Sequence, residues 1–521
     1  MAFTANLAEL IAEDKSGLLA KHDSWERVSL IEVATILNGA AFDSSMFNSS
    51  DGIPLARIRD VVSGRTATFY SGEYENTYLI AQGDLLIGMD GDFNTSYWGT
   101  QTALLNQRVC KITPNPIFCD KYFVGYALPA YLATINAHTP SVTVKHLSSK
   151  TIGEIELPLP PRSEQTRIVE KLDELLSDLD AGMGELKAAR RKLNRYRQSL
   201  LKAAVEGTLT ADWRAANGEP EETGTELLQR ILSERRAGWE KKQLAKLNEQ
   251  RKAPPKNWRA RYAEPVQPDQ DKLPTLPENW AWASLDQLLI QLRSGSAETS
   301  IREVTPFPIL KSSAVRQGSV DFSALNYVTE KQSREENVLA LHDLLITRLS
   351  GSVEYVGCCV TIDHLPDGAV QYPDRIFCGK MTPGFECLGT YISYWLRSPM
   401  ARTRIEAAAK STAGHKRISM SDLQPFPIPL PPLDELDVIT RRLENFSAQI
   451  ATLHESVFSG LLQATAQRKN VLKAAFAGQL VSQDPNEEPA SELLARIRAA
   501  RDTKASGSVA AKRGRKSKVT P

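Results

Sequence analysis

The chain has 521 residues, of which 42% are hydrophobic and 24% charged, and this ordinary globular balance leaves room for several domains and restricts disorder to short segments. The formal net charge of +1 hides two basic stretches without acids, residues 187–202 with seven Lys/Arg and residues 504–518 with six, so overall charge argues neither for nor against a nucleic-acid partner. No stretch approaches the roughly 18 apolar residues of a membrane span, and the N-terminus lacks a secretory signal, so we expect a cytoplasmic protein with no membrane partner.

The first 156 residues divide into a short helix and a strand-rich region. Residues 1–24 carry apolar side chains at helical spacing, which predicts a short amphipathic helix whose role stays open. Residues 25–156 consist of short β-type runs broken by Gly, Asn and Pro. This texture predicts a mixed, strand-rich globular domain.

Residues 157–209 begin with prolines and continue as a long helix. Pro158, Pro160 and Pro161 favour an extended approach, because proline lacks a backbone donor and restricts the residue before it. Ser163 is a suitable N-cap, and Gly207 a suitable stop. The apolar residues between them alternate at spacings of four and three, as in a coiled coil. A helix of about 43 residues is about 65 Å long. The expected seam positions are Ile168, Leu172, Leu175, Leu179, Leu186 and Leu193.

The rest of the chain repeats this plan. Residues 210–275 form a connector with a charged helix and a Pro-rich linker, and residues 276–425 return to the strand-rich texture. Residues 426–480 form a second proline-led helix that matches the first without gaps at an offset of 271 residues. Residues 481–521 are expected to form a C-terminal helix and a disordered basic tail. The expected seam positions of the second long helix are Ile439, Leu443, Phe446, Ile450, Leu453 and Val457.

The internal repeat predicts the architecture of the whole chain. Each long helix has one apolar face and therefore needs a partner, and its own copy is the obvious one. We predict an α+β fold in which two strand-rich globular domains are separated by two long antiparallel helices. These helices are expected to form an intramolecular coiled coil with a pseudo-two-fold internal repeat.

Known catalytic motifs are not recognisable in the sequence. There is no Gly-rich phosphate loop, and the six cysteines form no C-x-x-C pair and have no His at metal-ligand spacing, so we expect no cofactor and no metal in this chain. Residues 115–118 read NPIF and lack the second proline of the N-P-P-F found in adenine methyltransferases. Two alternatives stay open on the residues alone, a self-contained DNA-modifying enzyme with a cryptic site and a coiled-coil protein-interaction scaffold.

Polar and basic segments in both strand-rich domains have the chemistry for binding DNA. Arg348 can donate two hydrogen bonds to guanine, and Asn94 can pair with adenine. Lys416 and Arg417 form a compact basic cluster suited to phosphates. The candidate DNA-binding residues are Asp90, Gly91, Asp92, Phe93, Asn94, Lys145 and His146 in the first domain, and Arg348, Ser350, Gly351, Ser352, Lys416 and Arg417 in the second.

These segments together resemble a known family. The two long helices begin with LPLPP or IPLPP and end with LKAA, and the first and second domains contain GDLLIGMDGDFN and ITRLSGSVEYVG. Together these segments are similar to the specificity subunit of type I restriction-modification systems. Residues 226–231 of the connector (ELLQRI) recur in the C-terminal helix as residues 492–497 (ELLARI), which suggests the K-type branch. The resemblance implies two target-recognition domains that each read half of a bipartite, asymmetric double-stranded DNA target, with the two helices as a ruler between the halves.

The same resemblance implies a set of partners. Two methyltransferase subunits are expected to dock on the long helices, and restriction subunits to join the complex. The specificity subunit itself is expected to have no catalytic residues. S-adenosylmethionine, ATP and Mg²⁺ are then expected in the partner subunits and not in this chain.

Overall fold

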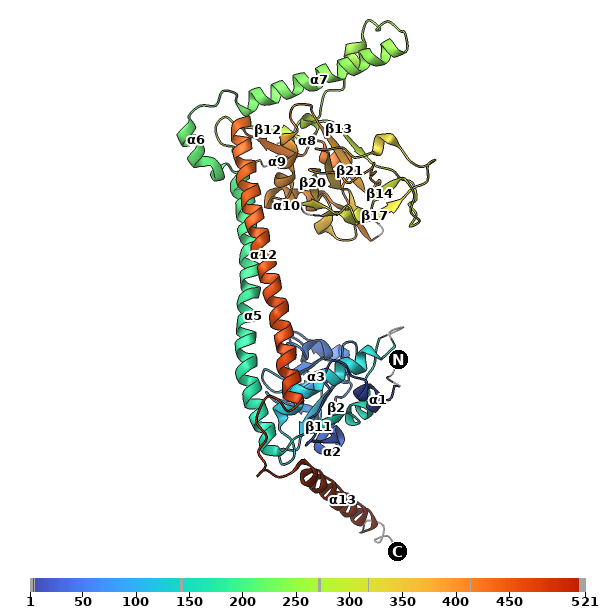
Figure 1. The fold of residues 1–521 in the computed structure, drawn as a ribbon, viewed down its shortest axis with the longest axis vertical. Coiled ribbons are helices and arrows are strands. Elements are labelled where there is room, and N and C mark those ends of the chain that lie inside the picture. Colours follow the sequence, from blue (N-terminus) through green and yellow to red (C-terminus); the bar gives the residue numbers. More distant parts are fainter. Residues whose placement is uncertain are drawn as a thin grey trace. The chain divides into compact units, whose positions relative to one another are not determined.

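The computed structural model describes the chain apart from residues 1, 2, 4, 141–143, 270–272, 317, 413 and 515–521. The chain forms two compact units, Met1–Lys187 with Phe458–Pro521 (unit 1) and Ala188–Val457 (unit 2). Two helices of 44 residues, α5 (Arg162–Val205) and α12 (Leu433–Phe476), each belong partly to both units (Figure 1). Most of the expected disordered tail lies outside the described residues.

Unit 1 is built on a four-stranded antiparallel sheet with the strand order β2-β10-β7-β8. A second, five-stranded sheet has the order β3-β5-β4-β9-β6, and its β4–β9 pair is parallel. The core lies between the first sheet and helix α3 (Lys121–Ala137), whose Phe123, Leu128 and Leu132 are buried. The other elements are α1 (Leu7–Ala12), β1 (Glu26–Ser29), α2 (Leu30–Val33), β2 (Ala34–Asn38), β3 (Phe47–Asn48), β4 (Ile53–Ala56), β5 (Phe69–Tyr70), β6 (Leu79–Ile80), β7 (Leu85–Gly88), β8 (Thr95–Tyr97), β9 (Ala103–Leu105), β10 (Val109–Pro114), α4 (Ser149–Gly153), β11 (Glu156–Leu159) and α13 (Ala490–Gly514).

Unit 2 repeats the four-stranded antiparallel sheet with the order β13-β21-β18-β20, which is the same 1-4-2-3 topology as in unit 1 when the four strands of each sheet are numbered in chain order. It replaces the five-stranded sheet of unit 1 by smaller pieces, including a three-stranded sheet β19-β23-β22. Its elements are α6 (Ala211–Asn217), α7 (Gly224–Glu249), β12 (Ala281–Ser284), α8 (Leu285–Leu288), β13 (Leu289–Ser294), β14 (Pro308–Leu310), β15 (Val315–Arg316), β16 (Ser319–Val320), β17 (Leu325–Tyr327), β18 (Leu344–Thr347), β19 (Leu349–Ser350), β20 (Cys359–Thr361), β21 (Ile376–Met381), α9 (Cys387–Leu396), α10 (Pro399–Ala408), β22 (Lys410–Thr412), β23 (His415–Arg417), α11 (Met420–Leu423) and β24 (Pro427–Leu430). The α+β fold with an internal repeat is confirmed.

The proline-rich segments form edge strands. β11 pairs only with β1, and β24 only with β12, each as a two-stranded antiparallel ladder. Proline is tolerated there because one side of the strand needs no backbone donor. The proline-rich strand of each ladder is followed directly by a long helix, α5 after β11 and α12 after β24.

Serines that recur between the copies begin short helices. Ser148 accepts a hydrogen bond from the backbone N–H of Thr151 at the start of α4. Ser419 accepts the same kind of bond from Asp422 at the start of α11. The shared serines are therefore explained by N-capping, which satisfies backbone donors that the first helical turn leaves unpaired.

The two long helices run antiparallel within each unit. In unit 1, Asp180 of α5 forms an ion pair with Arg468 of α12, and six residues later on α5 the side chain of Leu186 lies over Gly460. In unit 2, Leu201 of α5 and Leu443 of α12 share one buried cluster. Leu175, Leu179, Leu186 and Leu193 of α5 are half-buried.

One predicted seam residue is wrong. Leu453 is 51% exposed, while the neighbouring His454 is half-buried between the buried Ile450 and Val457. The heptad frame assumes 3.5 residues per turn, and a straight α-helix of 3.6 drifts away from that frame. Over this stretch the drift turns Leu453 outward. The residues that face the seam are then Ile450, His454 and Val457, with spacings of four and three.

The connector helix and the C-terminal helix pack in corresponding places. α7 packs on β12 and α8, and α13 packs on β1 and α2. Leu227 and Ile231 of α7 are buried in unit 2, as are Leu493 and Ile497 of α13 in unit 1. The sequence similarity between the two helices therefore reflects an equivalent structural role. The N-terminal segment also joins unit 1, because Leu19 is buried in its core.

Candidate nucleic-acid interface

In unit 1 the two segments predicted to bind DNA lie together. The turn that follows β7 is bonded through its backbone to residues 145–147: Gly91 donates to Lys145 O at 3.0 Å, and Leu147 donates to Met89 O at 2.7 Å. Asp90 and His146 form an antiparallel bridge between the two segments. These residues are about 55 positions apart in the chain, so only the fold brings them together.

A small charged cluster covers this junction. His146 Nδ1 lies 2.7 Å from Asp90 Oδ1, and Arg108 Nε lies 3.3 Å from Asp90 Oδ2. Arg108 keeps about half of its side chain exposed, so its guanidinium remains accessible beside the turn. Arg108 was missed by sequence reasoning, because a single arginine before a β-strand carries no local signal.

Not every predicted residue of this turn faces solvent. Phe93 is 1% exposed and lies in the core of unit 1 with a φ of 52°, so its side chain anchors the turn and cannot reach DNA. Lys145 is directed inward, where its Nζ donates to the backbone oxygen of Asn136 at 2.6 Å and to its Oδ1 at 2.9 Å. Gly91, Asp92 and Asn94 are exposed.

In unit 2 the predicted segments also meet, as neighbouring strands. β19 pairs with β23 in the register Leu349 to Arg417 and Ser350 to Lys416, and Ile418 donates to Arg348 O at 3.0 Å. β22 completes the sheet and adds the exposed Lys410. The β22–β23 hairpin therefore carries the cationic side chains Lys410, Lys416 and Arg417, and β19 pairs with it from a separate part of the sequence. Gly351 and Ser352 continue from it as an exposed turn.

Arg348 is held at the edge of this sheet. Its Nη1 donates to Asp374 O at 3.0 Å, and its guanidinium lies 5.5 Å from the centroid of the Phe377 ring. About a quarter of the side chain is exposed. Nη1 also lies 3.9 Å from the carboxylate oxygen Oδ2 of Asp374. These contacts engage Nη1 and one face of the guanidinium, which fixes its direction and leaves Nε and Nη2 for a ligand.

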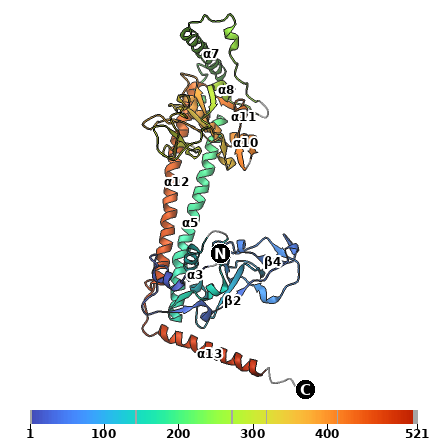
Figure 2. The ribbon, with the colours of Figure 1, turned by 90° about the vertical axis from the view of Figure 1, so that its right-hand side faces the viewer.

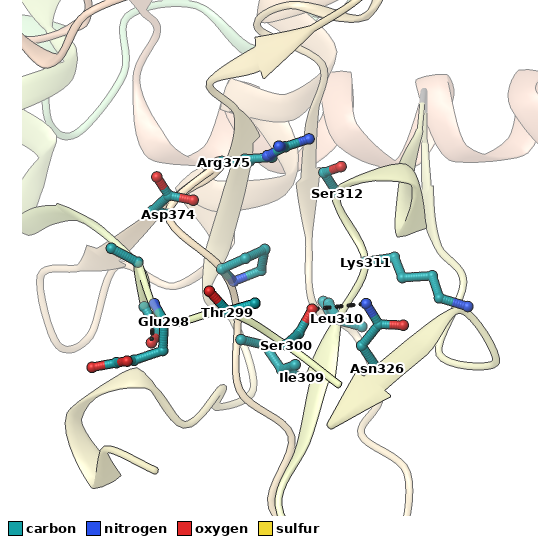
Figure 3. A pocket seen from close by; sticks show the side chains of 13 residues that line it. Glu298, Thr299, Ser300, Ile309, Leu310, Lys311, Ser312, Asn326, Asp374 and Arg375 are labelled. Carbon is teal, nitrogen blue, oxygen red and sulfur yellow. Dashed lines mark hydrogen bonds between the residues drawn. The ribbon is translucent and has the colours of Figure 1, made fainter. Parts of the chain in front are cut away.

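A polar cleft of about 510 Å³ has Asp374, the hydrogen-bond partner of Arg348, in its lining (Figure 3). Arg375 lines the same cleft. On its other side Asn326 donates to Ser300 Oγ at 2.8 Å, and the Lys311 side chain extends from a neighbouring segment. The sequence indicated none of this cleft, because its walls come from four separated segments. The lining residues are Ser296, Ala297, Glu298, Thr299, Ser300, Ile309, Leu310, Lys311, Ser312, Asn326, Pro373, Asp374 and Arg375.

Both surfaces combine cationic side chains with amide and hydroxyl groups. Exposed Arg and Lys neutralise phosphates, whereas amides, hydroxyls and carboxylates can discriminate base edges. Within the described residues no group of three or more His, Cys, Asp or Glu could hold a metal ion. No helix in the described part of the chain could cross a membrane.

Five of the six cysteines are buried, and Cys387 is exposed. Burial raises the pKa of Cys110, Cys119 and Cys378 to about 12, so these thiols stay protonated and unreactive near neutral pH. They contribute to packing, as expected for free cysteines among apolar neighbours.

Comparison with known proteins is consistent with this geometry. A family model described as the type I restriction modification DNA specificity domain matches residues 22–187. The chain is 33% identical over 516 residues to the type I restriction enzyme EcoBI specificity subunit of Escherichia coli, covering 96% of this chain and 97% of that protein. It is 28% identical over 504 residues to the EcoKI specificity subunit of Escherichia coli strain K12, covering 92% and 96%.

One solved structure shares the fold over most of the chain. It belongs to a study of complex assembly and conformational transition of the type I R-M system, and it superimposes with a TM-score of 0.53. The match covers 88% of this chain and 99% of that chain at 16% sequence identity.

Proposed function

The chain belongs to the type I restriction enzyme specificity subunits, and from this membership we propose that its two candidate surfaces each read one half of a bipartite DNA target. It is a non-catalytic DNA-recognition subunit that acts in a complex with methyltransferase and restriction subunits. One observation supports the assignment of the two surfaces. In each unit, segments far apart in the sequence pair with each other and form a polar, exposed surface.

The two surfaces differ in chemistry, which is what reading an asymmetric target requires. In unit 1 the turn with Asp92 and Asn94 offers acceptors and an amide beside the guanidinium of Arg108. In unit 2 the side chains of Lys416 and Arg417 are suited to phosphates, while Arg348 and the cleft lined by Asp374 are suited to a base edge. Each half-site is then read by its own set of donors and acceptors.

The partner subunits need a docking surface that differs from the DNA surfaces. Phe458 and Leu462 lie one turn apart on α12 and are 59% and 56% exposed, which is unusual for large apolar side chains. We propose that a methyltransferase subunit covers them. Two such subunits, with restriction subunits added, complete the complex. S-adenosylmethionine, ATP and Mg²⁺ are proposed to bind in those partners.

One experiment tests the proposed function directly. The chain is co-expressed with its methyltransferase partner, and N6-methyladenine is mapped across the host genome. We expect one bipartite sequence with a fixed spacer to be methylated. Methyl transfer or cleavage by the isolated chain would overturn the assignment, and so would methylation that follows no sequence.

A further inference from the structure

A projecting arm of unit 2 lies outside the proposed recognition surfaces. The first half of α7 packs on the unit through the buried Leu227 and Ile231. The second half extends beyond the sheets, and the chain then turns and comes back along it (Figures 1 and 2). We call residues 241–261, the distal part of α7 and the returning segment, the basic arm.

Aromatic stacking holds the returning segment against α7. The rings of Trp239 and Trp258 are stacked at 5.9 Å with an interplanar angle of 17°, and Tyr262 packs edge-on against Trp239. Arg259 Nε lies 3.1 Å from Glu240 Oε2, and Arg235 Nη1 donates to Tyr262 Oη at 2.8 Å. The returning segment is therefore anchored to α7 at the base of the arm.

The surface of the arm is strongly cationic. Residues 241–261 contain eight Lys/Arg and a single acid, Glu249. Within the described residues only Arg259 among the eight forms an ion pair. The seven others are exposed and have no acidic partner in the described part of the chain: Lys241, Lys242, Lys246, Arg251, Lys252, Lys256 and Arg261.

This chemistry fits a polyanion better than a protein partner. The cores of protein interfaces are depleted in Lys and are anchored by exposed aromatic residues. Here Trp239 and Trp258 stack on each other. Among the described residues of the arm, Leu244, which is 36% exposed, is the one large apolar side chain that faces solvent. Duplex DNA, with one charge per about 1.7 Å, offers a matching surface to the roughly 13 Å of helix in the arm.

The arm lies at the opposite end of the unit 2 sheet from the candidate recognition surface. Arg235, next to the arm, donates to Leu289 O at the start of β13. Arg348 lies over Phe377, which pairs with Ser294 at the end of the same strand. We propose that the basic arm binds the phosphates of duplex DNA outside the recognised half-site, adding affinity without sequence preference.

The test uses the full chain assembled with its methyltransferase partner. Lys241, Lys242 and Lys246 are changed together to Gln. The affinity of the complex for DNA is measured from low to high salt with two duplexes. One is a long duplex with additional DNA on both sides of the target, and the other is limited to the target. On the long duplex we expect weaker binding and a slope of log K against log salt that is shallower by about one to three, since each lost phosphate contact removes about 0.9. On the short duplex the slope should be unchanged.

The matched control removes the same charge elsewhere, by changing the exposed Lys187, Lys331 and Lys469 to Gln, and should leave both slopes unchanged. Arginine at the three arm positions should restore the wild-type slope. If the triple Lys→Gln variant has an unaltered slope on the long duplex, the inference about the arm is overturned. The proposed reading of half-sites still stands in that case if the complex prefers its target over random DNA. Loss of co-purification with the methyltransferase subunit also overturns it, because the arm would then be a protein-docking surface.

Discussion

The indole Nε1 of Trp280 donates a hydrogen bond of 2.8 Å to Oε2 of Glu435, joining the start of strand β12 to the first turn of helix α12 inside unit 2. The same relationship recurs in unit 1, where Trp25 Nε1 donates to Glu164 Oε2 at 3.0 Å. Both carboxylates are 1% exposed. Each unit therefore fastens its strand-rich part to its long helix through a buried tryptophan and glutamate.

The two buried carboxylates should respond differently to neutralisation. Glu435 also accepts hydrogen bonds from Thr210 and Arg214, so Glu435→Gln places an amide donor among three donors and removes the charge that pairs with Arg214. We expect a loss of about 2–4 kcal/mol in the free energy of unfolding of unit 2. Glu164→Gln should cost about 1 kcal/mol in unit 1, because the neighbouring Gln483 amide can rotate to accept.

Hydrogen exchange of the β12 and β1 backbone amides reports the two units separately, and each variant is the control for the other. Equal losses in the two units would show that the Arg214 ion pair adds nothing to the stability of unit 2.

Stability should also depend on pH through Glu164. Burial raises the pKa of this carboxyl, and hydrogen bonds from Gln483 and Trp25 and the charge of Arg167 oppose the shift only in part. A carboxyl with a raised folded pKa stabilises the fold below its ordinary pKa, and this contribution is lost as the pH rises through the folded value. The wild type should therefore lose stability relative to Glu164→Gln as the pH rises from below the ordinary carboxyl pKa toward neutral. Urea unfolding of both proteins over that range checks this, and a difference that does not change with pH would contradict it.

Base reading by Arg348 predicts a loss confined to one half-site. Arg348→Ala in the assembled complex should weaken binding by about 1–3 kcal/mol for the native target and relax the base preference at one position of one half. Lys416→Gln should weaken binding to every sequence alike and reduce the salt dependence by about one contact. Competition binding against singly substituted targets separates these outcomes. A uniform loss for Arg348→Ala would reassign this side chain to phosphate or to holding the cleft wall through Asp374.

Docking through α12 predicts a defect in assembly with an intact fold. Phe458→Ser with Leu462→Ser should lower the affinity for the methyltransferase subunit by tenfold or more, because each buried large apolar side chain contributes about 1.5–3 kcal/mol. Val304→Ser, at a side chain that is 76% exposed elsewhere, is the matched control. Titration followed by size-exclusion chromatography measures the change. Unchanged assembly would place the docking surface elsewhere.

Much of the candidate site was accessible from local sequence. The polar turn at residues 90–94 stood out because a loop rich in charge and glycine differs from the strands around it. Lys416 and Arg417 stood out as adjacent cationic residues, and the structure places them on strand β23. That the strand after Arg348 pairs with the strand of Lys416 and Arg417 was not visible, since strand pairing across more than 60 residues is decided by the whole core. Phe93 was predicted to contact DNA because it lies in a polar turn, but its left-handed backbone conformation directs the side chain into the core.

The sequence by itself determined the duplication, the two long helices, the proline-led strands and the family, because these depend on local spacing and on a repeat that needs no knowledge of contacts. Tertiary structure decided which predicted residues face solvent, where the cleft lined by Asp374 forms, and that the basic arm is held by stacked tryptophans. The physical reason is that burial and side-chain direction depend on contacts between distant segments, and only the folded chain brings those segments together.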